Sequence, residues 1–265
     1  MKAALILYIM LASAFFIHPA LAQEASPQLN GETPDNPTNA IPEKAQRLMD
    51  AYPEMGLKYT ENQIVFPDGT AIPFDDGKTK DFITMMNDSD IEDMFSMPYT
   101  SQAVPGYLQD AGRSRCETFF KKMYGRNAKS VQKNLVTVSW FGQKIKFSKI
   151  NGAAAHLQEV GKELAEHPEL KPYMKASGTY YWRKVRGADR LSAHSYGIAI
   201  DIAVKQSDYW KWGYPKAKET DEIGYKNRIP MEIVEIFENH GFIWGGRWYH
   251  YDTMHFEYRP ELAGK

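Results

Sequence analysis

The sequence has one cysteine, no excess of either charge, and no long apolar run beyond its first residues. Because Cys116 stands alone among 265 residues, no disulfide can form within the chain, and the fold must depend on its hydrophobic core. Cys116 begins an amphipathic segment, which favours a buried thiol over a nucleophile. The 32 basic and 33 acidic residues nearly balance, so there is no electrostatic basis for binding nucleic acid or an anionic membrane surface.

Residues 1–22 have the pattern of a secretory signal peptide. Lys2 precedes an apolar run that ends at Ile17, and a small-x-small cleavage site ends at Ala22. The run of about 15 residues is shorter than the ~20 that span a bilayer, which favours cleavage over a retained membrane anchor. We therefore predict a protein that is secreted across the cytoplasmic membrane, to the periplasm or outside the cell, without stable membrane insertion after cleavage.

Composition divides the rest of the chain into a linker and two folded parts. Residues 23–42 are rich in Pro, Asn, Ser and Thr, which predicts a flexible linker. Residues 43–112 are predicted to form an N-terminal extension with a helix and a hairpin that turns at Asp68-Gly69. Residues 113–265 mix strands and helices without a regular β-α-β repeat. This mixture predicts an α+β domain with a small, mainly antiparallel sheet and flanking helices.

Apolar periodicity and turn residues locate the expected elements. Helices are predicted at residues 42–51, 91–95, 116–124, 153–166 and 230–240. Strands are predicted within the hairpin 63–74 and at residues 135–140, 144–147, 178–185, 198–204 and 253–258.

Two short segments carry the residues that could bind a metal. Ser192-Ala-His-Ser-Tyr-Gly-Ile-Ala-Ile-Asp201 contains His194 and Asp201, and Asp252-Thr-Met-His255 follows later. Two imidazoles and one carboxylate leave a tetrahedral zinc ion one open position, which suits a reactive water rather than a structural site. A further carboxylate, Asp252, could then serve as general base and general acid. Strand alternation points Asp201 away from the neighbouring isoleucines, which predicts a zinc site on the face of a sheet.

Two other features offer alternatives or additions to this site. His250 could replace His255 as a ligand, but His255 is favoured because Asp252 then lies three residues before a ligand. The long connection at residues 205–228 carries Trp210 and Trp212. Long ordered loops are often functional, so these aromatics are predicted to line a substrate groove, with ordinary packing as the alternative.

The two segments resemble the VanY-like family of zinc D-alanyl-D-alanine carboxypeptidases and L-alanyl-D-glutamate peptidases. That family carries the pattern SxHxxGxAxD, followed by an acid three residues before a final histidine. The matching residues here are Ser192, His194, Gly197, Ala199, Asp201, Asp252 and His255. The resemblance covers about residues 113–262. It implies the Hedgehog/DD-peptidase fold, one Zn²⁺ ion, and cleavage of peptidoglycan stem peptides next to D-residues by a carboxypeptidase or an endopeptidase.

The resemblance also implies roles for individual residues. His194, Asp201 and His255 would bind zinc, and Asp252 would take a proton from the metal-bound water and deliver it to the leaving amine. Arg183 would hold the substrate carbonyl oxygen or a carboxylate. Arg186 and Arg190 are rival candidates for the role of Arg183, and Glu257 is either a partner of a ligand imidazole or an exposed strand residue. The residues predicted to bind substrate are Ser192, Trp210, Trp212 and Trp248.

Two other uses of zinc remain open. One is a zinc-containing module that binds cell-wall peptide without cutting it, although such a module needs no acid such as Asp252 beside the open position. The other is a purely structural zinc site, which would require four protein ligands, and only His250 is spare.

Overall fold

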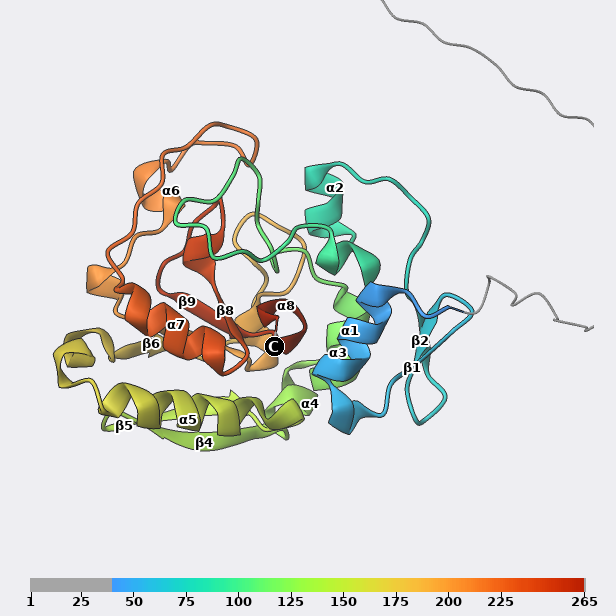
Figure 1. The fold of residues 1–265 in the computed structure, drawn as a ribbon, viewed down its shortest axis with the longest axis horizontal. Helices are drawn as coiled ribbons and strands as arrows, with labels where there is room; N and C mark the ends of the chain where they lie inside the picture. Colours follow the sequence, from blue (N-terminus) through green and yellow to red (C-terminus); the bar gives the residue numbers. More distant parts are fainter. Residues whose placement is uncertain (1–39, 265) are drawn as a thin grey trace, which may run out of the picture. The chain divides into compact units, whose positions relative to one another are not determined.

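A four-stranded antiparallel sheet, in the order β6-β7-β9-β8, lies at the centre of the second half of the chain (Figure 1). Its strands are β6 Ala176–Gly178, β7 Ala199–Ile202, β8 Phe242–Trp244 and β9 His255–Tyr258. β7 and β9 pair so that Asp201 is opposite His255. Directly opposite residues of an antiparallel pair project from the same face, so this register brings two residues from distant segments together.

The computed structural model describes residues 40–264. The predicted signal peptide and nearly all of the predicted linker lie outside the described residues. The contacts within the chain group Ile41–Lys265 into one unit, so the predicted boundary between residues 112 and 113 stays a prediction. No helix of residues 40–264 has the length and apolar character needed to cross a bilayer.

One helix packs on the apolar side of the central sheet, and a second helix packs beside the first. α7 Met231–Asn239 buries Ile233 and Phe237, and the Phe237 ring stacks on Phe256 of β9 at 4.0 Å between ring centroids. α5 Ala153–Ala165 packs against α7 and along the hairpin formed by β4 Leu135–Trp140 and β5 Gln143–Ser148 (Figure 1). The isoleucines that alternate along β7 and the apolar side chains on one face of α5 therefore belong to one hydrophobic core.

The N-terminal extension joins the same core. Its sheet consists of β1 Lys58–Thr60, β2 Gln63–Val65 and β3 Ala71–Pro73, and its helices are α1 Glu43–Ala51 and α2 Phe82–Asn87. Leu48 of α1 and Ile64 of β2 are fully buried and belong to the cluster that also contains Phe119 of α3 Glu117–Tyr124. The extension therefore shares apolar packing with the part of the chain that carries the predicted site.

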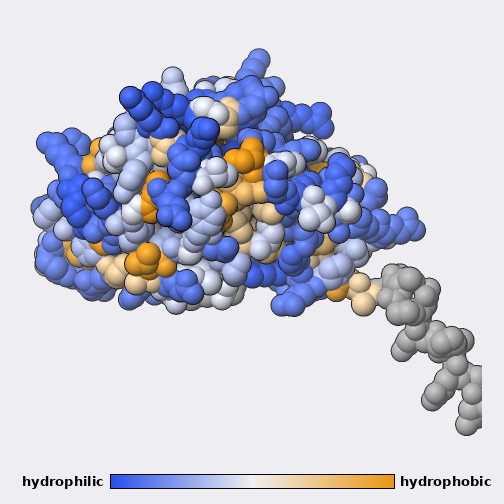
Figure 2. Space-filling model, turned by 90° about the horizontal axis from the view of Figure 1, so that it is seen from above, coloured by the Kyte–Doolittle hydropathy of each residue, from blue (hydrophilic) through white to orange (hydrophobic). Residues whose placement is uncertain are grey.

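The remaining elements are short. They are α4 Ala128–Gln132, α6 Trp210–Gly213 and α8 Pro260–Ala263, with 3₁₀ turns at Pro53–Met55, Glu92–Phe95, Ile150–Gly152, Pro168–Tyr173, Ala193–Tyr196, Val204–Gln206 and Gly245–Arg247. On the face drawn in Figure 2, polar side chains surround separate groups of apolar ones. Scattered apolar residues of this kind are ordinary on a protein surface.

The mixture of helices and small antiparallel sheets confirms the predicted α+β class, and the five predicted helical segments are helical. The predicted strand at 178–185 is wrong, because β6 ends at Gly178. Beyond it the backbone bonds to a side chain: the Arg183 N–H donates to Ser195 Oγ at 2.9 Å, and the Ser195 hydroxyl donates to Arg183 O at 2.7 Å. The short elements β1, α2, α4, α6, β8 and α8 were not predicted.

Candidate metal centre and substrate pocket

Three side chains from separate elements form a compact group with the chemistry of a metal site. His194 lies on the 3₁₀ turn Ala193–Tyr196, Asp201 on β7 and His255 at the start of β9. Asp201 Oδ1 is 3.2 Å from His194 Nε2 and 3.1 Å from His255 Nδ1. The three candidate ligand atoms all lie within 4.8 Å of one another, which is the spacing expected when one ion binds all of them.

The backbone between His194 and Asp201 requires a glycine. Gly197 has a φ of +70°, and a Cβ at this position would lie 2.4 Å from Leu135 Cδ2. A side chain here would therefore be strained and would also collide with β4. Gly197 lets the chain reverse direction tightly enough to bring both ligands to one point.

Hydrogen bonds on the far side of each imidazole orient the two rings. His194 Nδ1 donates to Thr179 O at 2.6 Å, and His255 Nε2 donates to Glu257 Oε2 at 3.1 Å. His194 Nε2 and His255 Nδ1, which face Asp201, are therefore the nitrogens that a metal ion would use. Outer partners of this kind hold metal-binding histidines in the required tautomer, so the donor set fits a divalent cation such as zinc.

The charges around His194, Asp201 and His255 favour a positive charge among these three side chains. Burial alone would lower the pKa of His255, but its hydrogen bonds to Asp201 and Glu257 raise it to about 10. Burial would raise the pKa of Asp201, but the two imidazoles hold it well below its usual range. The negative charges that keep a proton on His255 in the absence of metal would also attract a divalent cation.

Glu257 belongs to a chain of buried ionic contacts that leads away from His255. Glu257 Oε1 accepts from Arg259 Nη1 at 2.9 Å, and Arg259 Nε donates to Glu261. Glu261 Oε2 in turn accepts from the hydroxyl of Tyr52 at 2.5 Å, at the end of α1. Buried charges must be paired in this way. The network therefore ties a candidate metal ligand to the N-terminal extension, and Glu257 is not an exposed strand residue.

Asp252 lies beside the three-residue group without belonging to it. Its backbone N–H donates to Gly245 O at 2.9 Å, and its Oδ1 is buried with no hydrogen-bond partner in residues 40–264. Burial and the nearby charge of Asp201 raise the pKa of Asp252 to about 7, against the opposing effect of the imidazoles and Arg183. A carboxyl group that titrates near neutrality and has a free oxygen is suited to accept and return a proton.

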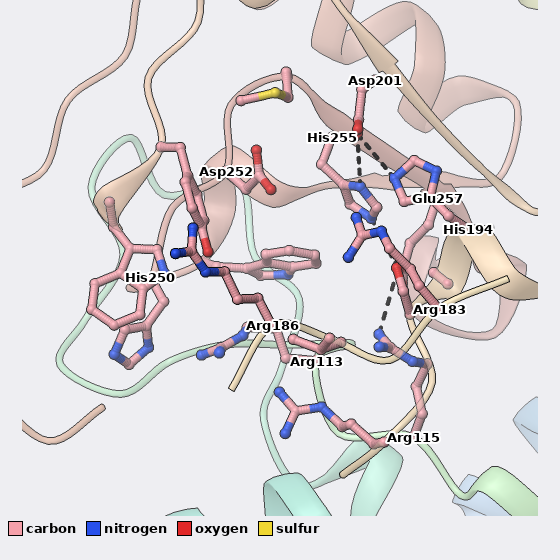
Figure 3. Close-up of a pocket in the computed structure, with 18 residues that line it drawn as sticks. Arg113, Arg115, Arg183, Arg186, His194, Asp201, His250, Asp252, His255 and Glu257 are labelled. Atoms are coloured by element: carbon pink, nitrogen blue, oxygen red, sulfur yellow. Dashed lines mark hydrogen bonds and ion pairs between the residues drawn. The ribbon is translucent and has the colours of Figure 1, made fainter. Parts of the chain in front are cut away.

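A cavity of about 390 Å³ opens over this arrangement. Its lining includes His194, Asp201, His255 and Asp252, and Figure 3 shows these side chains around one space. Perturbed acids and candidate ligands in a single cavity are a frequent mark of a catalytic site.

One known protein family matches the part of the chain that carries this group. Residues 186–258 match the model of a family described as D-alanyl-D-alanine carboxypeptidase. The matched segment contains all three members of the group and Asp252. The resemblance inferred from the sequence is therefore confirmed over this segment, and it supports a carboxypeptidase-like peptidase. A comparison with curated proteins found no match.

The structure brings Arg183 and its two rivals to the same cavity. Arg183 and Arg186 are exposed and line it, and neither has an acidic side chain within ion-pair distance among the described residues. Arg190 also lines the cavity, but it is buried and donates to Met86 O at 2.8 Å and Asn87 Oδ1 at 3.2 Å. Arg183 has a free guanidinium that influences the pKa of Asp252, so it remains the candidate for contact with the reacting group.

Three of the four residues predicted to bind substrate line the cavity. Ser192 and Trp210 are on its wall, and Trp248 lies with its ring 5.4 Å from that of His255. Trp212 is not among the lining residues. Its side chain is 56% exposed and packs edge-on against Tyr209 at 6.0 Å.

His250 lines the same cavity but is not one of the three candidate ligands. Its Nδ1 donates to Asp110 Oδ2 at 2.5 Å, and its backbone N–H donates to Asp110 Oδ1 at 3.0 Å. Asp110, together with the cavity residues Arg113 and Arg115, was missed by reasoning from the sequence. Asp110 and Arg113 pair locally, but no local pattern shows that they belong to the cavity, because the contacts that place them there are with the distant residues His250 and Glu219.

Proposed function

We propose that the protein is a secreted zinc peptidase that hydrolyses bonds next to D-amino acids in peptidoglycan stem peptides, as a carboxypeptidase or an endopeptidase. The observation that carries this proposal is Asp252, a carboxyl group with an unpartnered oxygen and a raised pKa beside three candidate ligands. The family match over residues 186–258 supports the reaction class. Residues 113–265 would form the catalytic domain, and residues 43–112 an extension that supports it.

In this proposal His194, Asp201 and His255 hold a single zinc ion. Zinc bound there would supply a strong Lewis acid and a water that ionises near neutral pH. Three protein ligands leave room for that water, as in other catalytic zinc sites. The hydrogen bonds from His194 to Thr179 and from His255 to Glu257 support this assignment because they use the outer nitrogens, so that the inward nitrogens can bind the metal once it displaces the proton.

Asp252 and Arg183 carry out the proton transfer and the charge stabilisation. Asp252 takes a proton from the attacking water and then delivers it to the leaving amine. Burial and Asp201 raise the pKa of Asp252 to about 7 without metal, which makes it a stronger base than an ordinary aspartate even though bound zinc would lower that value. Arg183 binds the substrate carbonyl oxygen, where negative charge develops. Its donors are available because no acid within residues 40–264 lies within ion-pair distance of it.

The experiment that tests this function is mass spectrometry of products after purified residues 23–265 are mixed with peptidoglycan. We expect peptide fragments that disappear when zinc is chelated and return when zinc is restored, and their masses identify the scissile bond. If the folded, zinc-loaded protein releases no fragments, the peptidase proposal fails. A zinc-containing module that binds wall peptide would then be the better assignment.

Glu257→Gln should weaken zinc binding by about 10- to 100-fold, because the variant loses the carboxylate that orients His255. The measurement is a competition titration with a chromophoric chelator. Glu163→Gln is the matched control, since Glu163 also bonds a histidine, His240, at 2.8 Å. Equal zinc affinity in the Glu257 variant and the wild-type protein would contradict the role assigned to Glu257.

A further inference from the structure

The near balance of charge over the whole chain, which gave no electrostatic basis for an anionic partner, hides an uneven distribution. Residues 118–158 contain eight basic residues and no acidic one, although the net charge of the chain is −1. Two of the eight are neutralised, because Lys121 pairs with Glu117 and Lys122 pairs with Asp68. The other six are exposed and have no acidic side chain within ion-pair distance among residues 40–264. They are Arg126, Lys129, Lys133, Lys144, Lys146 and Lys149, which we call the basic face.

The hairpin β4-β5 buries one side and exposes the other. α5 packs along this hairpin, and Phe147 on the buried side is fully enclosed. Side chains alternate along a strand, so Lys144 and Lys146 project from the exposed side. Their partners across the hairpin are the small polar residues Ser139 and Thr137, and neither strand contains an acid. The exposed side of the hairpin is therefore polar and cationic.

The other four cations of the basic face lie at one end of this hairpin. Figure 1 shows α4 at that end, and Lys129 lies on α4 while Lys133 directly follows it. Lys149 directly follows β5, and its backbone N–H donates to Asn134 O at 2.8 Å, next to Lys133. The basic face thus extends from the lysines of β5 to the short helix beside it.

An aromatic side chain occupies the turn at the other end of the hairpin. Phe141 and Gly142 connect β4 to β5, and Phe141 is 36% exposed. The φ of Phe141 is +41°, in the left-handed region that aromatic residues rarely adopt. Asn or Gly is the usual residue at such a position of a hairpin turn. A strained and partly exposed Phe at the tip indicates a use for the ring outside the core.

The chemistry of the basic face suits an extended anionic surface rather than a single small anion. Five of its six members are lysines, which act as point charges, whereas arginine is the residue that grips one phosphate or carboxylate with two bonds. None of the six lines the cavity over the candidate metal ligands. Near an anionic bilayer each Lys or Arg strengthens binding by about five-fold.

We propose that the basic face and Phe141 dock the protein on the surface of a bilayer that contains anionic phospholipids, without spanning it. The lysines bind the headgroup charges, and the Phe141 ring enters the boundary between headgroups and acyl chains. An anionic polymer such as wall peptide also attracts lysines, but it offers no apolar layer to Phe141. The predicted signal peptide would bring the chain across a membrane, which puts a bilayer within reach. This inference does not depend on the peptidase proposal.

The test is co-sedimentation of purified residues 23–265 with two kinds of vesicle, phosphatidylcholine alone and an equal mixture of phosphatidylcholine and phosphatidylglycerol. The wild-type protein binds the mixed vesicles, is released by salt, and does not bind phosphatidylcholine. Lys144→Gln/Lys146→Gln lowers the affinity for mixed vesicles by about 10- to 30-fold. Lys216→Gln/Lys218→Gln removes the same charge at the same spacing from exposed positions outside the basic face, and keeps the wild-type affinity.

A second variant separates a bilayer from other polyanions. Phe141→Asn keeps the turn, because Asn tolerates a positive φ. It lowers the affinity for mixed vesicles by about five-fold and leaves binding to poly-L-glutamate unchanged. Vesicle binding by Phe141→Asn at the wild-type level overturns the bilayer proposal, as does wild-type protein that binds insoluble peptidoglycan but not the mixed vesicles.

Two further outcomes also decide the proposal. An equal loss of affinity in the two double-lysine variants overturns it, because binding would then follow total charge rather than the basic face. Both double variants should melt at the wild-type temperature, since all four lysines are exposed. If Lys144→Gln/Lys146→Gln fails to fold, the comparison of the two vesicles with wild-type protein and with Phe141→Asn still gives the answer.

Discussion

Asp252→Asn is expected to lower kcat by about 10²- to 10⁴-fold, the usual contribution of a positioned acid or base. The amide has nearly the shape of the carboxylate but cannot accept a proton from the attacking water. Because Asp252 lies outside the group of candidate ligands, the variant should bind one equivalent of zinc as the wild-type protein does. The measurement is steady-state kinetics on the released peptide together with metal analysis of the same sample.

The pH dependence provides a second test of Asp252. Without metal, burial and Asp201 raise its pKa to about 7, and the added charge of zinc would lower it. Since the base must be ionised, wild-type kcat/KM should fall with decreasing pH along a limb centred below about 7, and this limb should be absent in Asp252→Asn. Asp50→Asn, an exposed change on α1, is the matched control and should behave as wild type. An unchanged kcat in Asp252→Asn would exclude the role of general base.

His194→Ala should lose both zinc and hydrolysis. The variant removes one of three ligands, and the hydrogen bond of His194 to Thr179 cannot be replaced by the shorter side chain. In the wild-type protein, zinc at 100 times its dissociation constant should stabilise the fold by about 2.7 kcal/mol. Zinc should therefore raise the melting temperature of the wild-type protein but not that of His194→Ala.

His167→Ala is the control for the ligand experiment. His167 lies with Glu169 and Glu232 in another group that could hold an ion by spacing alone, but that group is more exposed. This variant should keep a full equivalent of zinc, the thermal shift and the activity. A full equivalent of zinc in His194→Ala, or its loss in His167→Ala, would overturn the proposed ligand set.

The convergence of His194, Asp201 and His255 was predictable in part from the sequence because the orientation of two of them depends on local rules. Alternation along β7 sets the side of the sheet from which Asp201 projects, and Gly197 marks the reversal between His194 and that strand. The cross-strand pairing of Asp201 with His255 completes the group. This pairing was not predicted, because no local pattern shows which strands are neighbours.

The rest of the cavity depends on contacts between distant segments, which no local pattern encodes. The hydrogen bond between His250 and Asp110 joins residues that are 140 positions apart in the sequence. Arg190 donates to Met86 O, near the end of α2, which lies more than 100 positions before it. The segment after Gly178 is apolar and aromatic enough to predict a strand. Instead, the backbone N–H and C=O of Arg183 in this segment form hydrogen bonds with the Ser195 hydroxyl, where a strand would bond a neighbouring strand. The pattern of apolar residues does not reveal such a side-chain partner.

The buried contacts from His255 through Glu257, Arg259 and Glu261 to Tyr52 have a thermodynamic consequence. If zinc binds at His194, Asp201 and His255, its binding and the docking of α1 would share this network, and any coupling between them would have the same free energy in both directions. A change in the packing of the N-terminal extension would then alter the affinity for metal although the extension supplies none of the three candidate ligands.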